Sequence, residues 1–344
     1  MDSGFDILLK ELCETDGISG DESAVREYII DKIKDSCEYT VNPLGCIIAY
    51  KKGRKPASKK VMISAHMDEV GMIVTYINKD GTLCVSPVGG VEPEAVSDIQ
   101  VKVNGMTGVI GTLPIHHISK DDRNKPLSFD GFCVDIGAES REEAEKYVSL
   151  GDSVVFENNY SVSRGGFVTS KAIDDRAGCA MLIRLITEDI IEHDCIFTFV
   201  TQEEIGLRGA RTAAYTADPD FALVLEATTA ADTPLASDEK KCCICGGGAV
   251  ISYMDRSTCY DRELYRLCRE TAAENNILCQ TKTMVAGGND SGAIHLSRGG
   301  VRTAAISVPC RYLHSPSCTA KLSDIEECYR LAALIADKCA AMGN

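Results

Sequence analysis

The 344-residue sequence has no tryptophan, fewer basic residues than acidic ones (36 against 51), and no apolar run longer than a strand. The shortage of basic residues argues against a nucleic-acid partner, because the phosphate backbone is bound by clustered basic side chains. The short apolar runs exclude a membrane-spanning helix, which needs about 20 apolar residues. Without tryptophan, the chain also lacks a ring that sugar-binding platforms often use.

The amino-terminal stretch MDSGFDILLKELCETDG is acidic and amphipathic, and it lacks the positive start and apolar core of a signal peptide. We therefore expect a cytoplasmic protein, in which the 17 cysteines are reduced thiols. The cluster Cys242, Cys243 and Cys245 lacks the second pair of a structural zinc site. The net charge of −15 is mostly explained by a solubilising surface, although part of it could serve to bind cations.

The order of predicted elements indicates an α/β protein with an insertion. Before residue 70 and after residue 166, helical stretches alternate with buried strands, which is typical of a sheet covered on both faces. Between them lie short β runs with the hairpin signals NKDG and VNGMTG. We predict a central, mostly parallel sheet flanked by helices (residues 1–70 and 166–344) and an inserted, small β-rich domain (71–165).

Two capping boxes predict where helices begin. Ser19 with Glu22 precedes the helical pattern of Val25, Tyr28, Ile29 and Ile33, and Ser323 with Glu326 opens the last helix.

Polar side chains follow each predicted strand of the α/β part, where ligands of such sheets bind. His66 and Asp68 follow Val61–Ser64, Glu203 and Glu204 follow Ile196–Val200, Glu226 follows Ala222–Leu225, Arg311 and His314 follow Ala304–Pro309, and Asp174 and Asp175 precede a helix. Taken singly, each has an ordinary explanation: a structural histidine, a helix cap or a solvated turn. Together, two histidines and several carboxylates match the ligands of a hydrolytic, zinc-type site.

The adjacent acids in QEEIGLRGA suit such a site for a further reason. A metal that activates water needs a ligand and, separately, a base that takes the proton. If Glu203 and Glu204 point apart at a strand end, one can coordinate the metal and the other can reach the water.

The motifs AHMDEVG, KAIDDRAG, QEEIGLRGA and PCRYLHSP, the last preceded by GGND, resemble those of the M42 glutamyl-aminopeptidase family. These are dinuclear metallo-aminopeptidases, and some were once labelled cellulase M. The resemblance spans nearly the whole chain, from DGISGDE to RYLHSP. It implies a dinuclear zinc exopeptidase-like fold and an enzyme that removes N-terminal residues from peptides.

The resemblance also implies a ligand set. His66 and Glu226 would bind one divalent metal ion, Glu204 and His314 would bind the other, and Asp174 would bridge the two. Zinc and cobalt suit these ligands best, and manganese is also compatible with them.

The remaining implied roles support the metals. Glu203 would be the general base, Asp68 would hold His66 in the correct tautomer, and a cis peptide would join Asp174 to Asp175. Two departures from the family pattern bear on activity: Glu226 stands where an aspartate is usual, and Asn289 stands where a threonine is usual.

The implied partners are peptides with a free amino terminus and further copies of the chain. The family pattern implies a tetrahedral dodecamer built from dimers through the inserted domain, with no nucleic-acid or membrane partner. Three alternatives stay open: a non-catalytic assembly or binding protein of the same fold, a related dinuclear deacylase or carboxypeptidase, and a glycosidase. The glycosidase reading leaves His66, Asp174 and His314 without a role. Neither the native metal nor the preferred N-terminal residue follows from these patterns.

Overall fold

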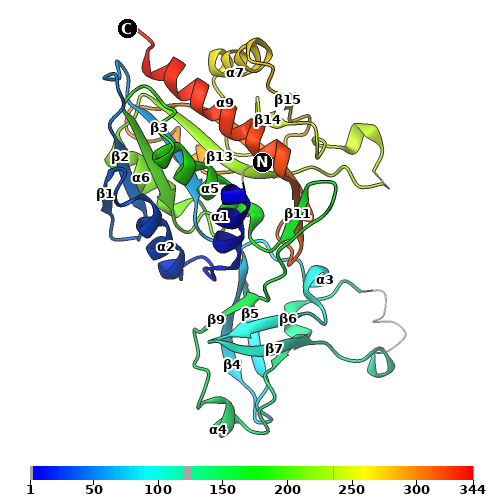
Figure 1. Cartoon of the computed structure of the whole chain (residues 1–344). Helices are drawn as coiled ribbons and strands as arrows, with labels where there is room; N and C mark the ends of the chain where they lie inside the picture. Colours follow the sequence, from blue (N-terminus) through cyan, green and yellow to red (C-terminus); the bar gives the residue numbers. More distant parts are fainter. Residues whose placement is uncertain (1–2, 119–124, 235, 344) are drawn as a thin grey trace.

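The computed structural model, which describes residues 3–118, 125–234 and 236–343, has a large α/β body and a small β-barrel beside it (Figure 1). The chain leaves the body after β3 (Val61–His66), builds the barrel, and returns after β9 (Ser153–Phe156). The predicted fold class, an α/β body with an inserted β-rich domain, is confirmed. The barrel strands run from Gly71 to Phe156, whereas the domain limits at 70/71 and 165/166 stay a prediction.

The described strands of the body form one sheet in the order β1-β2-β12-β3-β13-β16-β17-β11-β10, with β14 and β15 attached through β16. The four inner strands β12, β3, β13 and β16 are parallel. The strands on either side of them in this order pair antiparallel, whereas β14 and β15 are parallel to each other. The other strands are β1 (Glu38–Val41), β2 (Ile47–Lys51), β10 (Ser161–Val162), β11 (Phe167–Ser170), β12 (Cys195–Val200), β13 (Phe221–Thr229), β14 (Ala249–Ile251), β15 (Cys279–Thr281), β16 (Arg302–Arg311) and β17 (Cys318–Lys321).

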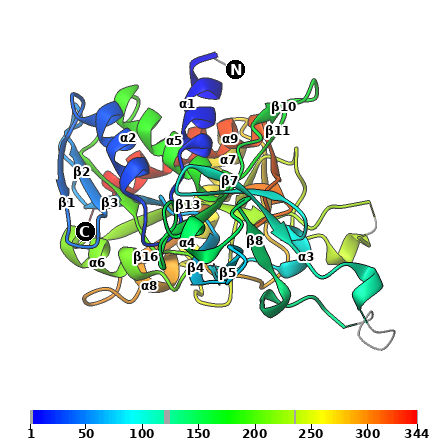
Figure 2. The ribbon, with the colours of Figure 1, turned by 90° about the horizontal axis from the view of Figure 1, so that it is seen from below.

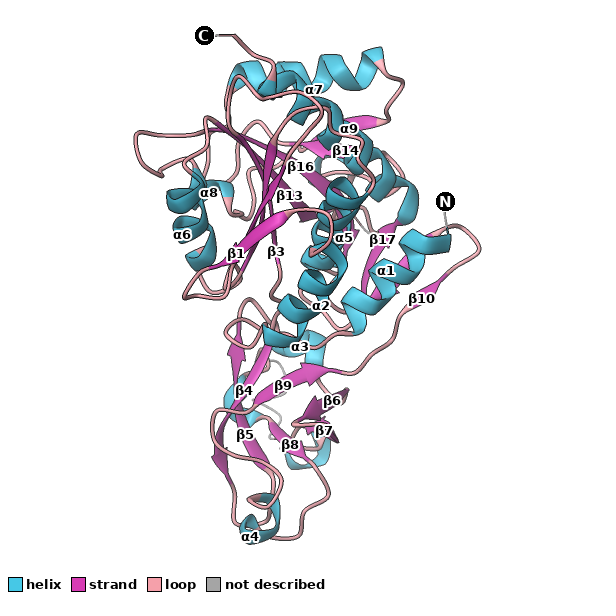
Figure 3. Cartoon of the chain, turned by 60° about the vertical axis from the view of Figure 1, so that its left-hand side comes forward, coloured by secondary structure: helices cyan, strands magenta, loops and turns pink. Residues whose placement is uncertain are grey.

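Helices cover both faces of this sheet (Figure 3). One face packs against α1 (Ser3–Glu14), α2 (Ser23–Ile33), α5 (Ile173–Thr187), α7 (Arg262–Glu274) and α9 (Leu322–Ala340), and the other against α6 (Arg208–Ala217) and α8 (Ser291–Ile294). All six residues of β3 are buried; Ile63 joins the first core and Met62 the second. In the part of the chain that the structure describes, no helix is long and apolar enough to cross a bilayer.

The barrel closes in the order β4-β5-β8-β7-β6-β9 around a core of its own. Figure 2 shows the molecule from below, with the barrel in front of the body. Asn104 and Gly105 both have positive φ, 48° and 80°, which suits the tight hairpin predicted between β6 and β7. Its elements are β4 (Gly71–Ile77), β5 (Leu83–Val88), α3 (Pro93–Val96), β6 (Gln100–Val103), β7 (Met106–Gly111), β8 (Cys133–Asp135) and α4 (Arg141–Ala144). Short 3₁₀ turns lie at Ile115–His117, Phe129–Gly131 and, in the body, Asp238–Lys240.

Both predicted capping boxes are wrong. Helix α2 begins at Ser23 with Glu22 as its N-cap, and no side chain caps it. The Ser19 hydroxyl instead donates a hydrogen bond to Asp68 Oδ2 at 2.5 Å, so it is bonded to a residue distant in sequence and not to the helix. Helix α9 begins at Leu322, one residue before the predicted cap, again without a side-chain cap.

Arg176 of α5 ties three segments together from a fully buried position. Its guanidinium donates to the carbonyls of Leu12 (2.5 Å), Thr15 (2.7 Å), Met67 (2.8 Å) and Gly17 (3.3 Å). The last carbonyls of a helix have no partner inside the helix, so Arg176 satisfies the end of α1. It also fixes the segment that leads from β3 toward Asp68.

Replacing this guanidinium should destabilise the protein severely. Arg176→Met leaves four carbonyls without that donor, and we expect a loss of about 3–5 kcal/mol in the free energy of unfolding. Denaturant unfolding followed by circular dichroism measures it. The control Arg330→Met removes a guanidinium whose side chain is 44% exposed, and it should cost less than about 1 kcal/mol. Equal losses for the two variants would contradict the anchoring role of Arg176.

Candidate metal centre

His66, the last residue of β3, is buried and has oxygen atoms near both ring nitrogens. Its Nδ1 lies 2.9 Å from the carbonyl oxygen of Asp68 and therefore carries the proton, because a carbonyl can only accept. Its Nε2 lies 3.3 Å from Asp174 Oδ1 and 3.2 Å from Glu226 Oε1. In the neutral tautomer the Nε2 lone pair therefore faces two carboxylates, and a cation is needed between them.

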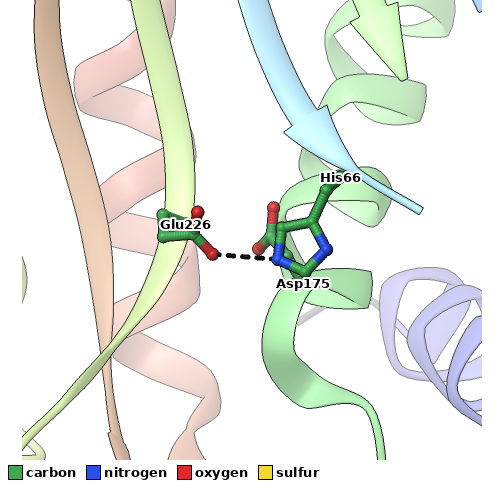
Figure 4. Close-up of side chains that lie close together, drawn as sticks. All are labelled: His66, Asp175 and Glu226. Carbon is green, nitrogen blue, oxygen red and sulfur yellow. Dashed lines mark ion pairs between the residues drawn. The ribbon is translucent and has the colours of Figure 1, made fainter. Parts of the chain in front are cut away.

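Glu226 reaches this point from the neighbouring strand. Figure 4 shows His66 on β3 and Glu226 on β13 pointing toward one another, with Asp175 beside them at the start of α5. The prediction that the strand stops at Leu225 is wrong, because β13 continues to Thr229. It pairs with β3 only from Phe221 to Val224, so Glu226 lies beyond the last residue that β3 pairs. The backbone there is still held by β16, which pairs with β13 along its whole length.

Asp174 lies between the two histidines. Its Oδ1 faces His66 Nε2 at 3.3 Å, and its Oδ2 faces His314 Nε2 at 3.4 Å. The peptide bond from Asp174 to Asp175 is cis, as the resemblance implied.

The capping role weighed for Asp174 belongs instead to its neighbour. Asp175 Oδ1 accepts a hydrogen bond from the backbone N–H of Gly178 at 3.0 Å, three residues further into α5. A Cβ at Gly178 would lie 2.2 Å from Asp175 Oδ2, so only glycine fits there. Both oxygens of Asp174 are therefore free of the helix and face the imidazoles.

The paired acids after β12 are held by Asp68. The backbone N–H groups of Glu203 and Glu204 donate to Asp68 Oδ1 and Oδ2 at 3.0 and 3.2 Å. Gln202, with a φ of 58°, turns the chain just before them. The backbone carbonyl of Asp68 is therefore the main hydrogen-bond partner of His66. The carboxylate of Asp68 lies further from Nδ1, at 3.5 Å, and accepts from the backbone of the turn.

The two acidic side chains have different partners. Glu204 Oε2 lies 3.3 Å from His314 Nε2, whereas Glu203 forms no ion pair with either histidine among the described residues. Burial raises the pKa of Glu203 well above its usual range, and it raises that of Glu204 to about 7. Glu204 thus faces the imidazole of His314, whereas the role of Glu203 stays a prediction.

His314 comes from the loop between β16 and β17, where its φ is 58°. The barrel touches it directly, because a Cβ at Gly90 would lie 2.9 Å from His314 Nδ1. Arg311, which was predicted to follow the same strand, is the last residue of β16. Its guanidinium binds both oxygens of Asp232 at 2.7 and 2.8 Å and takes no part in the centre.

The centre is crowded with acids that have few positive partners. Burial raises the pKa of Glu226 and Asp175 well above the usual range. Burial also acts to raise the pKa of Asp174, but the two imidazoles outweigh it and lower that pKa. Burial lowers the pKa of His66, yet Glu226 and Asp174 reverse the effect and hold it well above its ordinary value. The described residues thus supply only imidazoles as counter-charges, and divalent cations would offset the remaining repulsion.

The donor atoms suit such cations. Among the residues that the structure describes, three groups have all ligand atoms within 4.8 Å of one another: His66 with Asp175 and Glu226, His66 with Glu203 and Glu204, and Asp174 with Glu204 and His314. The last group is the predicted second set with its bridge. The first contains Asp175 where the resemblance has Asp174, although Asp174 Oδ1 is itself 3.3 Å from His66 Nε2. Imidazole nitrogens and carboxylate oxygens fit zinc, cobalt or manganese.

A cavity of about 560 Å³ opens onto these side chains. Asp174, Glu203, Glu204, Glu226 and His314 line one part of it. The barrel contributes Gly90, Glu92 and Ala95, so the cavity lies between the two parts of the molecule.

The sequence analysis did not predict the positions of two charged residues near the centre, Lys282 and Asp290. Lys282 lines the cavity, and nothing in its surrounding sequence marks it. Asp290 was quoted in GGND, but its complete burial was not predicted. Neither of its carboxylate oxygens has a hydrogen-bond partner among the described residues, and burial raises its pKa to about 7.

Comparisons with known proteins agree on one family. The family model described as M42 glutamyl aminopeptidase matches residues 45–331, a range that includes every candidate ligand. A putative aminopeptidase of Acetivibrio thermocellus is 43% identical over 327 residues, which are 94% of this chain and 96% of the relative. The lysyl aminopeptidase of Pyrococcus furiosus is 34% identical over 351 residues, 97% of each chain.

Solved structures agree as well. The TET1 peptidase of Pyrococcus horikoshii, described as able to assemble into a tetrahedron or a large octahedral shell, superposes with a TM-score of 0.85 at 34% identity. The match covers 96% of this chain and 99% of that one, so it includes both the body and the barrel.

Proposed function

Because the chain belongs to the M42 family of glutamyl aminopeptidases and is an aminopeptidase, we propose that two divalent metal ions act at its candidate metal centre. His66 and Glu226 would hold one ion, Glu204 and His314 would hold the other, and Asp174 would be shared between them. Zinc or cobalt fits this donor set, with manganese also compatible. Family membership sets aside the non-catalytic, carboxypeptidase, deacylase and glycosidase alternatives.

The position of Asp174 is the observation that carries this proposal. Each of its oxygens faces the Nε2 atom of a different histidine, at 3.3 and 3.4 Å. A bridging carboxylate offers one oxygen to each ion and offsets the repulsion between them. Asp175 is less suited to bridging, because Gly178 occupies its Oδ1 and it forms no ion pair with His314 among the described residues.

Glu203 acts as the general base. When bound, the two metal ions would lower the pKa of a water molecule and polarise the carbonyl of the scissile peptide bond. Glu203 takes the proton from the attacking water and returns it to the nitrogen of the leaving amine. Its raised pKa suits both transfers, because a base must also be able to hold the proton.

The acidic surroundings explain cleavage at a free amino terminus. The α-amino group of a peptide is cationic, and the carboxylates on this wall of the cavity attract it. Asp68 keeps Glu203 and Glu204 in place through their backbone N–H groups. Asp68 therefore acts as a positioning residue and does not touch the substrate.

The active form is a homo-oligomer, which we expect to be a tetrahedral dodecamer built from dimers. The likeness to the assembling TET1 peptidase supports this proposal. The barrel also exposes large apolar side chains, including Leu113 (56% exposed), Tyr147 (51%) and Leu150 (63%). Exposed apolar side chains of this kind are typical of contact surfaces between proteins.

Glu203→Gln should lower kcat by about 10²- to 10⁴-fold, because glutamine cannot accept the proton. The variant should still bind both metals. Hydrolysis of aminoacyl-p-nitroanilides and metal analysis of the same sample measure the two effects. If the variant lost a metal instead, Glu203 would be a ligand, and its role would have to be exchanged with that of Glu204.

Asp174→Asn should fold nearly normally but lose occupancy at both metal positions, because an amide is a poor bridging ligand. Titration calorimetry with zinc measures both positions. The matched variant Asp175→Asn keeps an oxygen for the Gly178 cap and should keep both ions. Full occupancy in Asp174→Asn together with loss in Asp175→Asn would move the bridge to Asp175.

Replacing residues 72–165 with a short glycine–serine linker should yield smaller particles, because the proposed contact surface is lost. Light scattering measures the particle mass, and circular dichroism checks that the body keeps its helices. An unchanged mass would show that the assembly contacts lie in the body.

A further inference from the structure

The clustered cysteines Cys242, Cys243 and Cys245 take no part in the proposed metal centre. Among the residues that the structure describes, Cys242 is the one cysteine that lines the cavity of about 560 Å³ at that centre. Cys245 points elsewhere, because its thiol donates to the carbonyl of Pro309 at 3.5 Å. Only 2% of Cys242 is exposed, so a reagent that reaches its thiol must be small and must enter through the cavity.

The backbone of Cys242 is held from two sides. Its N–H donates to the carbonyl of Ala230, just after β13, at 2.9 Å. Its carbonyl accepts from the N–H and the hydroxyl of Thr283, shortly after β15, at 3.0 and 3.1 Å. Both polar groups of the backbone are therefore occupied, and the thiol is the polar group that remains for the cavity.

The surroundings of this thiol stabilise a negative charge. The thiol of Cys243 contacts it, and the ammonium of Lys282 and the backbone N–H of Met284 lie nearby. Cys243 has one proton to donate, which a thiolate attracts more strongly than the carbonyl of Thr229 at 3.6 Å. The hydrogen bond from Cys243, together with Lys282, lowers the pKa of the Cys242 thiol to about 6, although burial acts in the opposite direction. At neutral pH Cys242 is then mostly a thiolate, which is the reactive form.

Lys282 gains a counter-charge from this arrangement. Only 8% of its surface is exposed, and its Nζ donates to the carbonyl of Ala286 at 2.7 Å. No carboxylate among the described residues forms an ion pair with it, although buried lysines are rarely left unpaired. The plain alternative is that Lys282 only braces the turn to Ala286. A brace, however, requires no thiol beside the ammonium, whereas a thiolate at Cys242 supplies the missing negative charge.

Other cysteines lack this combination of access and charge. Burial raises the pKa of the thiols of Cys13, Cys179 and Cys195. Contact with Cys310 lowers the pKa of Cys318, but Cys318 is buried and lines only a gap of about 10 Å³. Such a gap has room for about one water molecule and for no larger reagent.

We propose that Cys242 is a modification site in the substrate cavity, at which a small disulfide is captured and then blocks the binding of peptides. The thiolate attacks one sulfur of the disulfide R–S–S–R, forms a Cys242–S–S–R bond and releases R–S⁻. Atoms and electrons balance without a further oxidant. The group R then occupies the cavity beside the metal centre. The inference rests on the proposed function in one respect, because the peptide must bind in this cavity for the group to block it.

The neighbouring thiol of Cys243 does not remove the captured group. It would have to form a disulfide with the adjacent residue of the chain, whose Cα lies only about 3.8 Å away. Disulfides usually join Cα atoms that are roughly 4.4–6.8 Å apart. We therefore expect the mixed disulfide to persist until an added phosphine reduces it.

The pH dependence of labelling tests the reactivity of Cys242. Metal-loaded wild type is treated with 2-hydroxyethyl disulfide, a small uncharged probe, at pH 6 and pH 8, and peptide mass spectrometry follows each cysteine. Because the Cys242 thiol is already about half ionised at pH 6, its labelling rate should rise less than ~5-fold between the two pH values. In the urea-unfolded chain, the same cysteine should react ~50- to 100-fold faster at pH 8, as expected for an ordinary thiol.

Lys282→Met should make this pH dependence steeper, because the ammonium no longer favours the thiolate, and Lys282→Arg should keep it shallow. Lys241→Met is the matched control, since that lysine pairs with Asp238 and does not line the cavity. It should behave as the wild type does. The proposal is overturned if folded Cys242 is not labelled or follows the pH dependence of the unfolded chain. An unchanged pH dependence in Lys282→Met also overturns it, since the thiolate would then have no partner in Lys282.

Activity distinguishes a blocking modification from a harmless one. Hydrolysis of an aminoacyl-p-nitroanilide by the wild type should fall in proportion to the fraction of Cys242 labelled, with no loss of metal, and should return after phosphine reduction. Cys242→Ala should resist the same treatment. Full activity of completely labelled wild type, or equal inhibition of Cys242→Ala, overturns the proposal. A wild type that cleaves no aminoacyl substrate before treatment counts against the proposed function only, because labelling is measured without turnover.

Discussion

The mutual repulsion of buried carboxylates is the constraint around which this molecule is built. Asp174, Glu204 and Glu226 lie within 3.4 Å of an imidazole Nε2, and the described residues near them offer no lysine or arginine partner. Burying unbalanced charge is expensive, so the surroundings must hold these groups rigidly. The ends of β3 and β12, the far part of β13, and the start of α5 do so, while Arg176 and Asp68 fix the segments between them. The same cluster of carboxylates therefore affects both the stability of the fold and its affinity for metal ions.

Regular alternation and motif spacing were enough to predict the parallel centre of the sheet and the inserted β part. The failures involve contacts between segments distant in sequence. The Ser19 hydroxyl matched a local capping pattern, but it donates its hydrogen bond to Asp68, 49 residues away. Likewise, β1, β2, β11 and β17 are short, and their antiparallel pairing at the sheet edges depends on partners that no local pattern specifies.

The candidate ligands could be predicted because strand ends of one sheet converge, and the structure does bring His66, Asp174, Glu204, Glu226 and His314 together. Which oxygen each acid presents could not be predicted. Asp68 was expected to hold His66 in the correct tautomer; its carbonyl oxygen lies nearest the ring, while its carboxylate accepts from two backbone amides. Lys282 and Asp290 left no signal because a lone charged residue in a loop usually lies on the surface. Only tertiary structure reveals that these two are buried.

The contact of Gly90 with His314 has an evolutionary consequence. A methyl group at Gly90 would press on the ring at 2.9 Å, so a barrel residue helps define where a residue of the body can stand. Gly89 lies close to Glu204, since a Cβ added at Gly89 would be 3.2 Å from the Cβ of Glu204. The barrel therefore cannot be exchanged between relatives as an independent module. A different barrel inserted at this point would have to carry glycines at the same two positions. The barrel and the metal centre must therefore change together during evolution.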